Sequence, residues 1–197
     1  MRGRAFDASR RKRECHSRYA DYFEAENTSD ERHEWIDGAV YAMSGGTPEH
    51  ARPVSAINAE LRAALKGRCT VYSESAMIYV QDANSSTYAD VTVVCGPVVT
   101  MAVNRNGKML GEAITNPTVI VEVLSPSTER YDRQEKFGYN RKLASLQEYV
   151  LVSQDLRRIE VYPRPADGRG AWACEEARDG EAVLVHDSLI SVDSVYG

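Results

Sequence analysis

Several features that define common protein classes are absent from this chain of 197 residues. No run of about 18 apolar residues occurs and no apolar stretch follows the basic start, so we expect neither a membrane span nor a secretory signal. The G-x-G-x-x-G and Walker A patterns of nucleotide-binding folds are missing, as is the G-x-S-x-G pattern of serine hydrolases. We therefore expect a soluble, cytoplasmic protein with another kind of chemistry.

Cysteine is scarce and scattered along the chain. The four cysteines, Cys15, Cys69, Cys95 and Cys174, form no C-x-x-C pair and have no matching histidine spacing. This pattern argues against a zinc site and against a disulfide framework. We expect all four to be reduced, with Cys95 in the core.

The chain lacks an excess of positive charge: acidic residues outnumber basic ones, and the formal net charge is −5. A nucleic-acid partner usually leaves a basic footprint, so this balance weighs against one. The N-terminus is an exception, since six basic residues and one acidic residue precede Glu14. Residues 1–14 lack apolar periodicity and are predicted to be a disordered basic tail, which leaves one domain over residues 15–197. The acidic remainder suits a site that collects Mg²⁺ through carboxylates.

Apolar and turn residues alternate in a way that predicts one α/β or α+β domain. A hairpin is predicted where Asp37-Gly38 separates two β-prone runs, and an amphipathic helix from near His50 to about Lys66. Further strands are predicted at 70–73, 76–80, 88–94, 118–124, 147–153, 158–162, 171–174 and 182–186. The stretch 98–114 is predicted to be an irregular, exposed excursion. This order indicates a mixed sheet with helices outside it.

A single carboxylate, Glu122, interrupts the otherwise apolar run 118–124. Such a run is typical of a strand buried on both faces, where an ionised carboxylate costs several kcal/mol unless a cation or strong donors compensate it. Asp90 begins a second β-prone run, and helical spacing after the Glu122 strand places Lys136 on one face with Asp132. Two carboxylates on neighbouring strands beside a lysine suit a divalent metal and phosphodiester cleavage.

Each of these residues also has a purely structural explanation. Glu122 can be the buried ion-pair partner of Lys136, and Asp90 can cap the start of a strand. Lys136 can be a solvated helix residue, and His50 a surface or capping residue at a helix start. Their combination favours the catalytic interpretation, whereas any one of them alone favours the structural one.

Four blocks of sequence, in order, resemble the Uma-type restriction endonuclease-like family. This family is a branch of the PD-(D/E)XK nuclease superfamily in which the lysine has moved to the following helix. The resemblance covers roughly residues 19–163 and rests on the blocks 33–50, 88–97, 116–128 and 131–152. Any one block is weakly specific, whereas four in order are quite specific.

The resemblance implies a restriction-endonuclease-like mixed β-sheet flanked by helices, with an extra N-terminal hairpin and C-terminal strands. It also implies a metal-dependent DNA phosphodiesterase whose catalytic residues are Asp90, Glu122 and Lys136. Asp90 and Glu122 would hold Mg²⁺ or Mn²⁺. Glu34 and His50 match family positions that complete the site.

The chain departs from the family pattern in three places. Leu124 occupies the slot in which the superfamily usually has its lysine, and Lys136 is expected to replace it. Ala89 stands where the family has a proline before the aspartate. Asn140 stands where the family commonly has a tyrosine, and Tyr139 comes one position earlier, which turns its phenol about 100° away on a helix.

We therefore expect a metal-dependent endonuclease that acts on DNA. A homodimer is also expected, because double-strand cleavage needs two sites and exposed strand edges need cover. The alternative is a catalytically silent nuclease-fold module that binds nucleic acid or protein, since a fold does not by itself determine a function. The net charge of −5 slightly favours this alternative.

Overall fold

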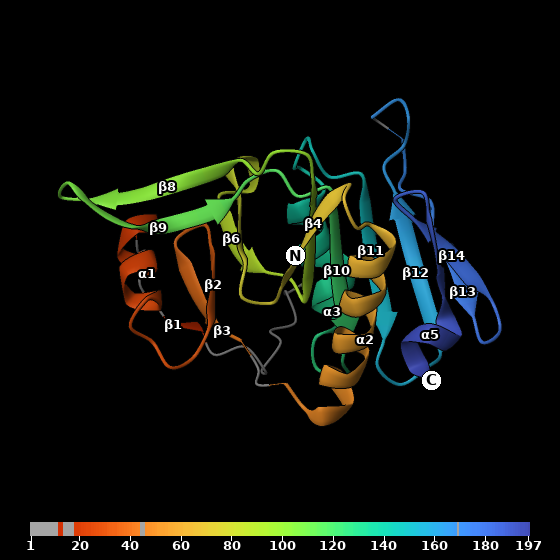
Figure 1. Ribbon diagram of the computed structural model, residues 1–197. Helices are drawn as coiled ribbons and strands as arrows, with labels where there is room; N and C mark the ends of the chain where they lie inside the picture. Colours follow the sequence, from red (N-terminus) through yellow and green to blue (C-terminus); the bar gives the residue numbers. More distant parts are fainter. Residues whose placement is uncertain (1–11, 14–17, 44–45, 169) are drawn as a thin grey trace, which may run out of the picture.

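The strands of the protein form two large mixed sheets and one small sheet, with few helices around them (Figure 1). The computed structural model describes residues 12–13, 18–43, 46–168 and 170–197. This arrangement confirms the predicted mixed α+β class. Of the predicted basic tail, Lys12–Arg13 form the short strand β1, which pairs with β3 (Ala39–Ala42). The other residues of that tail lie outside the described part of the chain.

The first large sheet has seven strands in the order β1-β3-β2-β6-β5-β9-β8. Besides β1 and β3, its strands are β2 (His33–Ile36), β5 (Met77–Val80), β6 (Ser85–Tyr88), β8 (Thr100–Arg105) and β9 (Lys108–Ile114). The predicted N-terminal hairpin is β2–β3, and its turn residues have φ of 48° at Asp37 and 83° at Gly38. Both values suit the primed turn that this dipeptide favours.

The stretch predicted to be irregular is instead the hairpin β8–β9, and that prediction is wrong. Asn106 and Gly107 have φ of 49° and 77°, so they form a tight hairpin turn. Helix α1 (Tyr19–Glu26) packs on this sheet through Tyr22 and Phe23. The buried rings of Tyr22 and Phe23 therefore stabilise β8 and β9, although these strands lack strict alternation of apolar and polar residues.

The second large sheet has six strands in the order β13-β12-β11-β10-β7-β4. Their bounds are β4 (Cys69–Ser73), β7 (Val91–Cys95), β10 (Val119–Leu124), β11 (Glu148–Ser153), β12 (Arg158–Pro163) and β13 (Glu175–Arg178). All six residues of β10 are buried, and its pairing with β11 is parallel. The prediction of a strand covered on both faces is thus confirmed.

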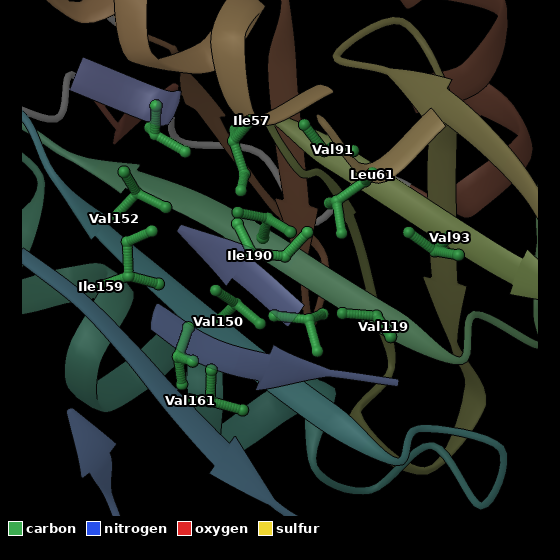
Figure 2. Packing of buried hydrophobic residues seen from close by; sticks show 14 of the residues in the cluster. Ile57, Leu61, Val91, Val93, Val119, Val150, Val152, Ile159, Val161 and Ile190 are labelled. Carbon is green, nitrogen blue, oxygen red and sulfur yellow. The ribbon is translucent and has the colours of Figure 1, made fainter. Parts of the chain in front are cut away.

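One face of this sheet is covered by helix α2 (Pro48–Ala64), helix α5 (Val192–Tyr196) and the hairpin of β14 (Ala182–Val185) and β15 (Ser188–Ser191). Figure 2 shows Ile57 and Leu61 of α2 and Ile190 of β15 against Val119 and Val150 of the sheet. Thr47 caps α2 by accepting a hydrogen bond from the N–H of His50. The odd-numbered residues of β10 face this side.

A helical stretch after β10 covers the opposite face. It runs through α3 (Glu129–Tyr131), the π-helical turn η2 (Asp132–Lys136) and α4 (Phe137–Asn140). The ring of Phe137 stacks on Tyr149 of β11 with centroids 4.6 Å apart. A short 3₁₀ turn, η1 (Gln81–Ala83), follows β5. Within the described ranges, no helix has the length and apolar character that crossing a bilayer requires.

Cys69 and Cys95 form a disulfide, so the prediction that all cysteines are reduced is wrong. The two residues are direct neighbours in the antiparallel pair β4–β7. They lie far apart in sequence, and only the register of these strands brings the sulfurs together. Cys95 is half-buried rather than in the core, and Cys174 is free and exposed.

Candidate active site

A pocket of about 1000 Å³ opens where the two large sheets approach the start of α2 and the helical stretch after β10. All five residues predicted from the sequence line it: Glu34, His50, Asp90, Glu122 and Lys136. They come from β2, α2, the entry to β7, β10 and the π-helical turn. The fold thus collects in one place residues that lie up to 102 positions apart in the sequence.

Strand register sets Asp90 beside Glu122. β7 and β10 pair in antiparallel fashion with Val91 opposite Val121, and continuing this register by one residue places Asp90 opposite Glu122. Side chains at directly opposed positions share a face of the sheet. The N–H of Val123 donates to Oδ2 of Asp90 at 2.6 Å, which fixes the orientation of that carboxylate.

Lys136 lies at the centre of the buried charges. Its Nζ is 2.9 Å from Oε1 of Glu122, 3.3 Å from Oε1 of Glu34 and 3.9 Å from Oδ1 of Asp132. It also donates a 2.7 Å hydrogen bond to the carbonyl of Tyr88. All four charged side chains are at most 6% exposed. One ammonium therefore faces three carboxylates in a place that water hardly reaches.

Burial and this charge imbalance shift the pKa values of the cluster. Desolvation raises the pKa of Glu122 well above its usual range, although Lys136 opposes the shift. Desolvation likewise raises the pKa of Asp132 to about 6, again against the influence of Lys136. Desolvation lowers the pKa of Lys136, but the surrounding carboxylates outweigh it and the net shift is upward. These shifts favour the charged form of Lys136 and the neutral forms of Glu122 and Asp132, because one ammonium faces three buried carboxylates.

His50 faces Asp90 across the mouth of the pocket. Its Nε2 lies 3.3 Å from Oδ1 of Asp90, and both side chains are about one-fifth exposed. The hydrogen bond with Asp90 raises the pKa of His50, and it outweighs desolvation, which lowers that pKa. His50 therefore orients Asp90 at the opening of the pocket.

Tyr131 and Asp132 line the pocket and contact its buried charges, but they were not among the predicted site residues. The hydroxyl of Tyr131 donates to Oε2 of Glu34 at 2.9 Å, which holds that carboxylate toward Lys136. Asp132 had a sequence signal, because it precedes Lys136 by four. A single sequence offers no sign that Tyr131 would meet a residue 97 positions away.

The departures from the family pattern have plain structural outcomes. Leu124 is buried in the apolar cluster with Ile120 and Tyr149, so it fills space where the superfamily usually has its lysine. Asn140 is fully buried, and neither atom of its side-chain amide has a hydrogen-bond partner among the described residues. The family's tyrosine position is thus a core position here.

The donor set fits a hard divalent cation held by few protein ligands. Asp90 and Glu122 are adjacent by register and both line the pocket. In the described part of the chain, however, the pocket residues offer no three donor atoms within 4.8 Å of one another. Mg²⁺ is commonly bound through one or two carboxylates with water and substrate phosphates completing its shell. The pair Asp90 and Glu122 suits that mode.

Comparison with solved structures defines the class to which this fold belongs. A crystal structure described as that of a putative nuclease belonging to DUF820, from Anabaena variabilis, matches with a TM-score of 0.68 at 16% sequence identity. The match covers 90% of this chain and 96% of the other. The chain therefore shares the fold of that protein.

The family follows from sequence comparison. The Uma2 family model, described as "Putative restriction endonuclease", matches residues 19–193, and the chain belongs to this family. The predicted resemblance is confirmed. Two similar proteins come from Synechocystis sp., both described only as uncharacterized. One, slr1290, is 35% identical over 181 residues, 89% of each chain. The other, sll1609, is 31% identical over 175 residues, 88% of this chain and 93% of the other.

Proposed function

We propose that this protein is a Mg²⁺- or Mn²⁺-dependent endonuclease that hydrolyses phosphodiester bonds in DNA. The family and the fold support a nuclease-like function. The observation that carries the proposal is the buried cluster in which Lys136 contacts Glu122, Glu34 and Asp132 beside the ionisable pair His50 and Asp90. Such a concentration of negative charge in a pocket suits a bound cation.

In this proposal Asp90 and Glu122 hold the metal. A divalent ion there would lower the pKa of a bound water and neutralise charge on the phosphoryl group. Lys136 adds a fixed positive charge where charge develops in the transition state, and Glu34 and Tyr131 hold that lysine in position.

The second candidate is a catalytically silent module on the same fold. One observation favours it: Lys136 already has an ion pair with Glu122 and a hydrogen bond to the carbonyl of Tyr88, as a structural lysine would. The net charge of −5 points the same way. The desolvation cost of the buried charges argues against this candidate. Replacing a buried ion pair with apolar residues is often neutral or stabilising, so a purely structural role does not require these charges.

The test compares the parent protein and its Asp90→Asn variant for cleavage of supercoiled plasmid in the presence of Mg²⁺ or Mn²⁺. The matched control is Asp82→Asn, which changes an exposed aspartate outside this pocket. We expect Asp90→Asn to lose both metal affinity and cleavage while its circular dichroism spectrum stays unchanged. Equal cleavage by the two variants would refute the assignment of Asp90.

We also propose that the protein works in the cytoplasm as a homodimer. Double-strand cleavage needs two sites, and β8 is the outer strand of its sheet, with exposed Val99 and Met109 on the same hairpin or beside it. A second copy is the partner that would cover this edge.

A further inference from the structure

The disulfide has a histidine beside it. Among the described residues, one group of three Cys, His, Asp or Glu donor atoms lies within 4.8 Å of one another, and it consists of Cys69, Cys95 and His186. All three residues are half-buried rather than enclosed in the core. None of them lines the pocket described above.

His186 is held over the disulfide by its turn. His186 and Asp187 have φ of 46° and 59°, so they are the two central residues of the tight turn between β14 and β15. The N–H of His186 donates to Oε2 of Glu148 at 2.8 Å. Nη2 of Arg68, the residue before Cys69, donates to the hydroxyl of Ser188 at 2.6 Å. The turn is thus tied to β11 on one side and to the start of β4 on the other.

We propose that the reduced form of this group is a Zn²⁺ site with Cys69, Cys95 and His186 as ligands. Two thiolates and one imidazole are ligands that Zn²⁺ prefers, at about 2.3 Å for sulfur and 2.0–2.1 Å for nitrogen. A tetrahedral site with these bond lengths separates two sulfurs by roughly 3.8 Å. Side-chain rotation of Cys69 and Cys95 provides that separation without a change in strand register.

Zn²⁺ binding requires that the disulfide first be reduced to two thiols. Two thiol molecules of the glutathione class reduce the Cys69–Cys95 bond, and they leave as their own disulfide after supplying two electrons and two protons. Zn²⁺ then displaces the two protons from the thiols of Cys69 and Cys95, and His186 binds through its neutral ring. The fourth position is left to water or to the carboxylate of Glu148, which already contacts the turn. In a reducing compartment such a pair is kept as thiols.

Cobalt is the probe, because Co²⁺ replaces Zn²⁺ and reports its ligands by absorption. The starting protein carries Cys15→Ser and Cys174→Ser, so that its only thiols are Cys69 and Cys95. After reduction with a phosphine, we expect one Co²⁺ to bind with thiolate-to-cobalt charge-transfer bands and tetrahedral d–d bands. Zn²⁺ should remove these bands, excess Mg²⁺ should not, and the oxidised protein should show none.

The matched variants are His186→Asn and Asp187→Asn. Asparagine tolerates the left-handed backbone of both turn positions, so neither variant should disturb the turn. We expect His186→Asn to weaken Co²⁺ binding at least about tenfold and Asp187→Asn to leave it unchanged. The proposal is overturned if the reduced protein lacks charge-transfer bands, if His186→Asn binds Co²⁺ as tightly as the parent, or if circular dichroism shows that reduction unfolds the chain.

Discussion

At the scale of single residues, Lys136 decides between the two functions. Its ammonium is buried and contacts Glu122 at 2.9 Å and Glu34 at 3.3 Å. A structural lysine exists to balance these carboxylates, whereas a catalytic lysine also acts on charge that appears during the reaction. The two roles have different consequences when the charge is removed and the apolar stem is kept.

Replacing Lys136 with Met makes that separation, because Met retains most of the stem's packing. If Lys136 stabilises transition-state charge, metal binding should persist while plasmid cleavage falls by on the order of 10²-fold or more. Lys142→Met, which changes an exposed lysine after the same helical stretch, is the control and should cleave normally. Calorimetric metal titration and single-turnover cleavage provide the two readouts.

The structural role predicts a different pattern for Lys136→Met. Leaving a buried carboxylate without its cation costs about 3–5 kcal/mol, so the variant should lose thermal stability. Adding Glu122→Gln should then restore stability, because the uncompensated charge is gone. Wild-type cleavage rates in Lys136→Met, under conditions where the parent needs metal, would contradict a catalytic lysine.

The sequence identified Glu122 because a lone charge in an apolar run needs compensation. It also placed Asp90 and Lys136 as companions, and the structure brings all three to one pocket. It could not identify Tyr131, whose contact with Glu34 depends on how the two sheets meet. Nor could it find the group of Cys69, Cys95 and His186, because its members come from three elements and share no local spacing.

At the scale of elements, the helical stretch after β10 positions the site. Its π-helical turn carries both Asp132 and Lys136. Such turns are rare and occur frequently at functional sites. On its outer side, Arg133 is anchored to β12 by two hydrogen bonds to Glu160, at 2.5 and 2.8 Å. The anchor fixes the rotation of the turn and therefore the direction of Lys136.

We expect Arg133→Met to lower the free energy of unfolding at neutral pH by about 1.5–3 kcal/mol, the scale for hydrogen bonds to a charged group. Desolvation raises the pKa of Glu160, but its bonds with Arg133 and Tyr162 outweigh it and the net shift is downward. A depressed carboxylate pKa stabilises the fold above its unfolded value of about 4.3 and loses this effect as pH falls further. The difference between variant and parent should therefore shrink in acid.

Urea unfolding at several pH values measures this difference, with Arg130→Met as the control for loss of an exposed arginine on the same stretch. A difference that stays constant from neutral pH down to acid would show that Arg133 acts by packing alone.

Elements with strong local signals were predictable, and those held by tertiary contacts were not. The hairpin at Asp37-Gly38 and the doubly buried β10 follow from turn chemistry and an apolar run. The hairpin β8–β9 was missed because its sequence has a glycine and a polar turn but little alternation. Packing of Phe23 at Gly111, where a Cβ would lie 2.7 Å from the ring, stabilises it instead.

At the scale of the whole molecule, the pocket depends on both large sheets at once. Glu34 comes from β2 of the first sheet and Glu122 from β10 of the second, and Lys136 contacts both. The charged cluster is therefore part of the contact between the sheets. A change in their relative position would alter the site as well as the core.

The proposed homodimer is also tested at this scale. Light scattering at micromolar concentration should give twice the mass of the 21.9 kDa chain. If β8 lies at the contact, Val99→Lys should shift the equilibrium toward monomer by like-charge repulsion, whereas Leu184→Lys on another exposed surface should not. A monomer at every concentration would remove the proposal.

The most direct test of the central claim is a metal titration of the purified protein on plasmid and on single-stranded DNA. We predict that cleavage is absent in a chelator, rises with Mg²⁺ or Mn²⁺ to a plateau, and disappears in Glu122→Gln. Glu135→Gln, which alters an exposed glutamate beside Lys136, should titrate like the parent. No cleavage at any metal concentration, or cleavage that persists in the chelator, would contradict a metal-dependent nuclease built on Asp90, Glu122 and Lys136.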